Sequence, residues 1–142
     1  MYKLFTDGGS RGNPGPSAIG GILYQDKKII SEFSECIGKA TNNQAEYRSL
    51  IKGLEMAKKK DIKELDCYLD SELVINQMNR RYKIKDVDLA PLFVKVWNLS
   101  LNFKKIKYHH VLRSHNKEAD YLVNMALDKS PRSEKGGGDK NN

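Results

Sequence analysis

Four acidic side chains stand at predicted strand ends and helix starts rather than in charged surface runs. Asp7 follows the apolar segment 2–6, and Asp70 closes the alternating segment 64–70. Glu46 falls within about 40° of the apolar stripe of one helical pattern, and Asp120 borders the apolar face of another. Carboxylates near a core are costly unless a cation neutralises them, and no Lys or Arg is evidently dedicated to these four. Converging in this way, they would suit hard divalent cations.

Each acid alone also has an ordinary structural explanation. Asp70 is suited to capping the helix predicted after it, and Glu46 suits the positive end of a helix. The case for a metal site is the shared placement of all four. If the strands before Asp7 and Asp70 are parallel neighbours, both acids reach the same edge of the sheet.

The elements that must position these acids follow from hydrophobic periodicity. Segment 7–16 contains four glycines and two prolines, which predicts a loop. Thr41 or Asn42 is expected to cap the first helix, and Asn116 the last. The expected strands are 2–6, 18–25, 29–36, 64–70 and 106–112, and the expected helices are 43–60, 71–79, 89–101 and 116–129.

This order of elements predicts the α/β class. Three antiparallel strands open the chain, and each of the last two strands follows a helix. Those two should therefore run parallel to the first strand in one five-stranded mixed sheet, with helices on both faces.

Length and composition narrow the function classes. The 142 residues predict one folded domain, 1–129, followed by a disordered tail, 130–142, which has almost nothing apolar to bury. A net charge of +7 favours a polyanionic partner. No apolar run approaches the ~20 residues of a membrane span. No signal-like start and no paired cysteine motif is present, so we expect a cytoplasmic protein without a membrane partner.

Four segments around the acids resemble the four motifs of type 1 ribonuclease H, in the right order and across nearly the whole predicted domain. They are 7–16, 41–46, 69–71 and 116–120. Each motif is weak alone, but together they are specific. The resemblance implies a ribonuclease H-like fold and endonucleolytic hydrolysis of the RNA strand of RNA–DNA hybrids. It further implies two Mg²⁺ ions, for which Mn²⁺ can substitute, and products with 5′-phosphate and 3′-hydroxyl ends.

The resemblance also assigns residues. Asp7, Glu46, Asp70 and Asp120 match the metal-binding acids of the family. Asparagine and glutamine amides suit the 2′-hydroxyl of RNA because they both donate and accept, although turn formation is the ordinary role of Asn and Gly. Thr41, at a helix start, suits a phosphate of the DNA strand. The expected nucleic-acid contacts are Gly9, Ser10, Arg11, Gly12, Asn13, Thr41, Asn42, Asn43, Gln44 and Ser71.

Two departures from the best-known bacterial pattern stand out. Only residues 79–86 separate two helices where those proteins insert a basic helix, so this chain resembles the compact variant. The basic residues there, Arg80, Arg81, Lys83 and Lys85, are candidates to grip the DNA strand.

The second departure concerns the histidine that many members carry on a loop roughly ten residues before the last aspartate. His110 has that spacing, but it falls inside a predicted strand, as does His109. His115, five residues before Asp120, is the expected proton carrier.

The sequence bears on two other function classes, a nucleic-acid-binding domain without catalysis and a nuclease that cuts DNA. A hybrid- or double-stranded-RNA-binding domain without catalysis predicts the loss of at least one acid, and all four are present. A DNA-cutting enzyme on the same fold is disfavoured by the amide-rich segment 42–44. We expect a monomer whose partner is an RNA–DNA hybrid, and the sequence leaves open whether double-stranded RNA also binds.

Overall fold

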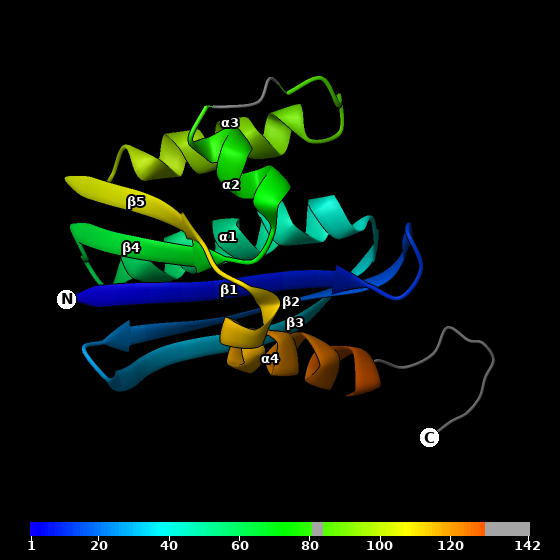
Figure 1. Cartoon of the computed structure of the whole chain (residues 1–142), viewed down its shortest axis with the longest axis horizontal. Coiled ribbons are helices and arrows are strands. Elements are labelled where there is room, and N and C mark those ends of the chain that lie inside the picture. Colours follow the sequence, from blue (N-terminus) through cyan, green and yellow to red (C-terminus); the bar gives the residue numbers. More distant parts are fainter. Residues whose placement is uncertain (81–83, 130–142) are drawn as a thin grey trace.

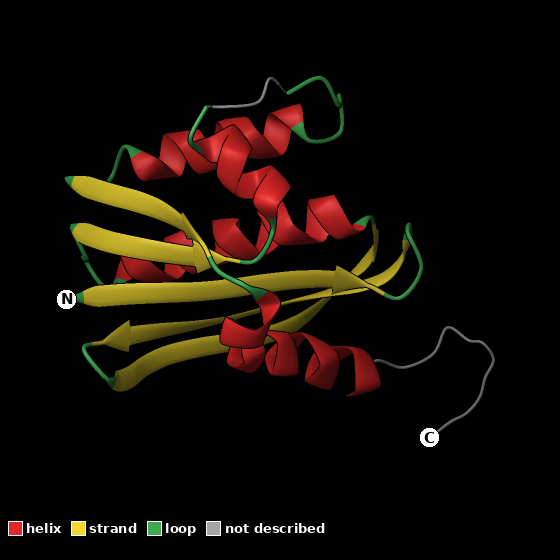
Figure 2. Cartoon of the chain, in the orientation of Figure 1, coloured by secondary structure: helices red, strands yellow, loops and turns green. Residues whose placement is uncertain are grey.

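A computed structural model of the chain describes residues 1–80 and 84–129, so Arg81, Lys83 and the expected tail 130–142 lie outside it. Figures 1 and 2 show one mixed sheet flanked by helices. Within the described residues, no helix is both long and apolar enough to cross a membrane. The elements are β1 (Tyr2–Ser10), β2 (Gly15–Gln25), β3 (Lys28–Ala40), α1 (Asn42–Lys59), β4 (Glu64–Leu69), α2 (Glu72–Met78), α3 (Ala90–Ser100), β5 (Lys105–His110), the 3₁₀ turn η1 (Arg113–His115) and α4 (Lys117–Lys129).

The sheet has the strand order β3-β2-β1-β4-β5. Strands β1, β2 and β3 pair antiparallel, whereas β4 pairs parallel to both β1 and β5. The predicted five-stranded mixed sheet is therefore confirmed. The central strand is β1, and it is the strand that carries Asp7.

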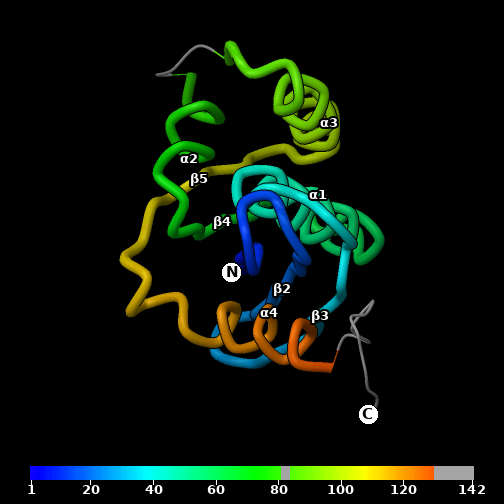
Figure 3. The backbone as a smooth tube through the Cα atoms, turned by 90° about the vertical axis from the view of Figure 1, so that its right-hand side faces the viewer, coloured from blue at the N-terminus to red at the C-terminus, as the bar shows by residue number. Residues whose placement is uncertain are grey.

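Helices cover both faces of the sheet, as expected. The view in Figure 3 separates α1, α2 and α3 from α4, which packs on the opposite face. The larger core lies beneath α1, where Leu50 and Leu54 meet the inward side chains of β4, Leu65 and Leu69. The smaller core, beneath α4, consists of Ala18, Val123, Ala126 and Leu127.

The prediction that residues 7–16 form a loop is wrong for most of that segment. Strand β1 continues to Ser10 and β2 begins at Gly15, so Asp7 lies inside a strand rather than at its end. Gly12, with a φ of 109°, does lie in the turn between these strands, but Gly8 serves packing: a Cβ on Gly8 would lie 2.2 Å from the carbonyl oxygen of Ala45 in α1. Parallel pairing of β1 with β4 nevertheless stops at Phe5, so Asp7 does stand where these two strands part.

Candidate active site

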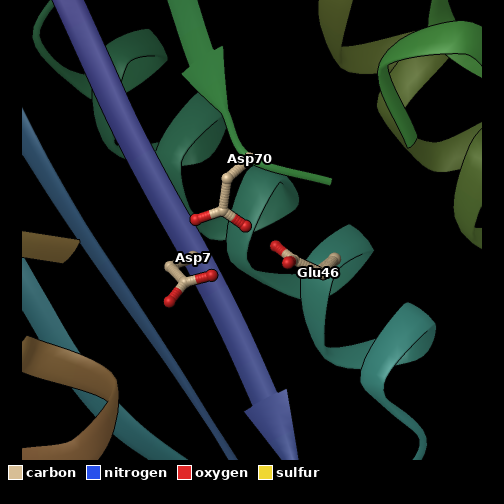
Figure 4. Close-up of side chains that lie close together, drawn as sticks. All are labelled: Asp7, Glu46 and Asp70. Atoms are coloured by element: carbon tan, nitrogen blue, oxygen red, sulfur yellow. The ribbon is translucent and has the colours of Figure 1, made fainter. Parts of the chain in front are cut away.

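Three carboxylates from three different elements converge beside the central strand. Figure 4 shows Asp7 on β1, Asp70 directly after β4 and Glu46 on α1, with their oxygens turned toward one another. One oxygen of each lies within 4.8 Å of the other two. The expected convergence of Asp7 and Asp70 at one sheet edge is confirmed, with Glu46 added from the helix above.

The start of α1 fixes the position of Glu46. The hydroxyl of Thr41 accepts a hydrogen bond from the amide of Gln44 at 3.1 Å, and the Gln44 side-chain oxygen accepts from the Thr41 amide at 2.9 Å. This capping box confirms Thr41 as the helix cap. It directs Glu46 toward the sheet, where the amide of Gly8 donates to Glu46 Oε1 at 3.2 Å.

Asp70 is free of the capping role that offered an ordinary explanation for it. The cap of α2 is Ser71, whose hydroxyl accepts from the amide of Val74 at 3.2 Å. Asp70 Oδ2 instead accepts a hydrogen bond from Asn116 Nδ2 at 3.1 Å. Asn116 directly precedes α4, as expected of a helix cap, and its backbone carbonyl accepts from the amide of Asp120. Its side chain does not cap the helix, because its oxygen has no partner within the described residues.

Asp120 joins the group from the other face of the sheet. Asp7 shares its side of β1 with Gly9, where a Cβ would lie 3.4 Å from Val123 of α4. The side chain of Asp120, in the first turn of α4, lies close enough for its charge to raise the pKa of Asp7. All four acids line one cleft of about 610 Å³. Six of the expected nucleic-acid contacts line it as well: Gly9, Ser10, Arg11, Asn42, Asn43 and Ser71.

Burial favours the protonated form of two of the four acids. Asp7 is 3% exposed and Glu46 is 8% exposed. Burial, followed by the charges of Asp70 and Asp120, raises the pKa of Asp7 to about 8, and Arg113 opposes this shift. Burial, followed by the charges of Asp7 and Asp70, raises the pKa of Glu46, and the hydrogen bond from the Gly8 amide opposes this shift. No ion pair within residues 1–80 and 84–129 involves any of the four acids, so the site fits hard divalent cations.

The raised pKa of Asp7 predicts how the Mg²⁺-free protein responds to pH. Asp7 holds its proton more tightly when folded than in the unfolded chain, where its pKa is near 3.8. Stability should therefore fall as the pH rises from about 4 to about 8, and a divalent cation bound by the acids should restore part of it. Melting temperatures with EDTA and with Mg²⁺ across this range measure the effect. The Asp7→Asn variant should lose less stability over the same range, and a parallel decline in both proteins would contradict the assignment.

The expected amide contacts lie along the start of α1 and the tip of the β1–β2 hairpin. Their oxygens are already used by backbone amides: Asn42 Oδ1 accepts from Ser10 at 2.8 Å, and Asn13 Oδ1 accepts from Asn42 at 3.0 Å. The side-chain oxygen of Gln44 is used in the capping box. Within residues 1–80 and 84–129 the side-chain NH₂ groups of these three residues donate no hydrogen bond, so they are available as donors. Gly12, Asn13, Thr41 and Gln44 lie beside the cleft lining rather than in it.

Arg11 and His115, two further residues singled out in the sequence, differ in whether they line the cleft. Arg11 lines the cleft, but its guanidinium donates to Asp128 at 2.6 Å and to Asn124 at 3.4 Å, both on α4. His115 is exposed at the end of η1 and lies outside the cleft lining. His109 and His110 lie in β5, as predicted.

Arg113 is the basic residue of the cleft that the sequence argument missed. It begins η1, lines the cleft with the four acids and lowers the pKa of Asp7 through its charge. The available sequence signal was a basic residue in the connection between the fifth strand and Asp120. That description fits both Arg113 and His115, and only the fold separates them.

Comparisons with known proteins agree with this geometry. A protein family described as reverse transcriptase-like matches residues 5–126. A crystal structure of ribonuclease H1 from Halobacterium salinarum is 40% identical, with a TM-score of 0.89 over 91% of this chain and 98% of that one. The structure of LC11 ribonuclease H1 in complex with an RNA/DNA hybrid is 38% identical, with a TM-score of 0.86 over 91% of this chain and 98% of that one.

Some relatives are longer than this chain. A bifunctional protein of Mycobacterium tuberculosis is 43% identical over 130 residues, which are 90% of this chain but 36% of that protein. The chain thus spans about a third of the length of this relative. The similarity therefore concerns one region of the mycobacterial protein.

Proposed function

Because the chain belongs to the type 1 ribonuclease H family, we propose that it is an endonuclease that hydrolyses the RNA strand of RNA–DNA hybrids. The observation that carries this proposal is the convergence of Asp7, Glu46 and Asp70 in a cleft that Asp120 also lines. The net charge of +7 suits a nucleic-acid substrate. We expect the protein to act as a monomer in the cytoplasm.

The four acids would hold two Mg²⁺ ions, for which Mn²⁺ can substitute. When bound, the ions would activate a water molecule for attack on phosphorus and stabilise the leaving 3′-oxygen, which gives 5′-phosphate and 3′-hydroxyl ends. Two of these acids also accept hydrogen bonds from the chain: the Gly8 amide donates to Glu46, and Asn116 Nδ2 donates to Asp70. None of the acids needs to act as a nucleophile.

Discrimination of RNA from DNA would come from groups that contact the 2′-hydroxyl. The amide nitrogens of Asn13, Asn42 and Gln44 have their donors free, and Asn43 lies exposed in the cleft. These donors suit the 2′-oxygen and the acceptors of the minor groove. The peptide groups at Gly9 and Gly12 permit close approach of the RNA backbone, and Ser10, Arg11 and Ser71 add contacts. Thr41, at the start of α1, suits a phosphate of the DNA strand.

Cleavage of labelled duplexes tests the proposal. RNA–DNA, RNA–RNA and DNA–DNA duplexes of one sequence are incubated with Mg²⁺, with Mn²⁺ and with EDTA. We expect cleavage of the RNA strand in the hybrid, dependence on the metal, and 5′-phosphate ends. Cleavage in EDTA, or equal cleavage of DNA–DNA, would contradict the proposal, and hybrid binding without cleavage would favour the binding-domain alternative. The RNA–RNA duplex measures the breadth of the substrate range.

Arg113 is expected to contribute to turnover. Its charge acts on the acid cluster and is placed to face a phosphate held there. Arg113→Ala should lower kcat about a hundredfold, as loss of one positioned donor does. Arg113→Lys, which keeps the positive charge, should retain part of the wild-type kcat. Steady-state kinetics on the hybrid measures this, and an alanine variant with unchanged kcat would remove Arg113 from the mechanism.

His115 is proposed as a proton carrier at the mouth of α4. If it carries a proton, His115→Ala should lower kcat roughly tenfold, with little change in KM or stability because the side chain is exposed. The loss should shrink at alkaline pH, where imidazole is neutral. A pH profile of kcat from 6 to 9 is the measurement. An unchanged profile would show that turnover does not use this histidine.

A further inference from the structure

Asn116 is a buried amide at the junction between η1 and α4. It is only 1% exposed. Its side-chain nitrogen donates to the carbonyl oxygen of Thr6 at 2.9 Å and to Asp70 Oδ2 at 3.1 Å. These two acceptors account for both hydrogens of the amide. The amide orientation is fixed by its partners, since the opposite one would place an oxygen against two other oxygens.

This side chain stands where the two acid-bearing strands separate. Pairing of β1 with β4 ends at Phe5 and Tyr68, so the carbonyl of Thr6 lies just beyond the last paired position. Asn116 Nδ2 donates a hydrogen bond to this carbonyl, and the same nitrogen also donates to Asp70 Oδ2. Its own backbone carbonyl accepts from the amide of Asp120 at 3.1 Å. One residue thus contacts the chain next to Asp7, the side chain of Asp70 and the backbone of Asp120.

We propose that Asn116 is a positioning residue that holds the Asp70 carboxylate in the orientation a divalent ion requires. This inference rests on the proposed function. A carboxylate turns readily about its terminal bond, and a fixed donor on Oδ2 selects one orientation and leaves Oδ1 for a ligand bond. Asn116 Oδ1 has no partner within the described residues, which is a cost to the fold. Burial of Asn116 is therefore explained by the two hydrogen bonds that its side-chain nitrogen donates and not by its side-chain oxygen.

Direct binding of Mg²⁺ to the full chain tests this assignment. Mg²⁺ alone is titrated into ¹⁵N-labelled wild type and Asn116→Ala, with amide shifts near the acids as the readout. We expect the variant to bind Mg²⁺ 10- to 100-fold more weakly, the usual effect of losing a hydrogen-bond partner of a metal ligand. Its kcat should fall in the same range with KM for the hybrid little changed. Val96→Ala, fully buried in α3, is the control for lost stability alone and should bind Mg²⁺ normally.

A double-mutant cycle separates positioning from a general structural role. If Asn116 acts through Asp70, Asn116→Ala should weaken Mg²⁺ binding little further in the Asp70→Asn background. Asn116→Ser fills more of the space and keeps one donor, so it serves if the alanine variant does not fold. Unchanged Mg²⁺ affinity in the folded variant, or full additivity with Asp70→Asn, would overturn the inference. Wild type that binds no Mg²⁺ at the acids would instead refute the proposed metal site.

Discussion

Replacement of Asp7 by Asn should lower the rate of hybrid cleavage at least about a thousandfold. Asp7 interacts with each of the other three acids, so its replacement affects the whole cluster. Metal-assisted catalysis supplies several kcal/mol of transition-state stabilisation, and a loss of about 4 kcal/mol corresponds to about a thousandfold. Affinity for the hybrid should be unchanged or improved, because phosphate contacts dominate binding and one negative charge is removed.

Single-turnover cleavage and a filter-binding assay on the same hybrid separate these two effects. Asp70→Asn should show the same loss of cleavage, with affinity for the hybrid unchanged or improved. Asp61→Asn is the matched control, since this exposed aspartate lies outside the cleft and has a φ of 59°, which asparagine also adopts readily. Near wild-type turnover of either test variant in Mg²⁺ would remove that residue from the site.

Replacement of Gly8 by Ala should destabilise the protein strongly. The added Cβ would lie 2.2 Å from the carbonyl oxygen of Ala45 and 2.6 Å from the amide nitrogen of Glu46. These are backbone atoms of α1, so the whole helix start must shift. Overpacking of this kind costs about 3 kcal/mol, which lowers the melting temperature by about 10 °C in a domain of this size. The same shift would move Glu46 away from the other acids.

Gly9→Ala is the matched control for this prediction. There the Cβ would lie 3.4 Å from Val123 Cγ1, an ordinary contact with a side chain. Its melting temperature should stay within about 2 °C of wild type. Thermal unfolding followed by circular dichroism measures both variants. Equal melting of the two would show that α1 tolerates the displacement.

Local patterns predicted most of the scaffold because the relevant signals are themselves local. The helical spacing of Leu50 and Leu54 and the alternation of Leu65 and Leu69 each reflect one buried face. The extent of the β1–β2 hairpin was not predicted, because Gly8 responds to a distant partner. Gly8 lacks a side chain on account of Ala45, which is close in space but separate in sequence. Composition alone cannot distinguish such a contact from a turn.

Some residues of the candidate site were likewise predicted from the sequence, and others were not. The four acids were predicted from motifs and from their placement, and they meet in the structure. The side-chain role of Asn116 was not predicted, because a residue just before a helix suggests a cap. Its hydrogen bond to Thr6 spans 110 positions of sequence. Whether Arg113 reaches the cleft depends on the direction in which η1 points its side chains, and hydrophobic periodicity does not predict that direction.

The two unequal cores have a consequence for partial unfolding. Three of the acids lie on or directly after β1, β4 and α1, elements packed into the large cluster. Asp120 lies on α4, which contributes three of the four residues of the small cluster. Opening free energies in native-state hydrogen exchange follow buried apolar contact, so α4 belongs to the less protected unit. A transient state with α4 detached would keep three of the acids together and separate Asp120 from them. Local fluctuation, without global unfolding, can thereby set the fraction of molecules with a complete acid cluster.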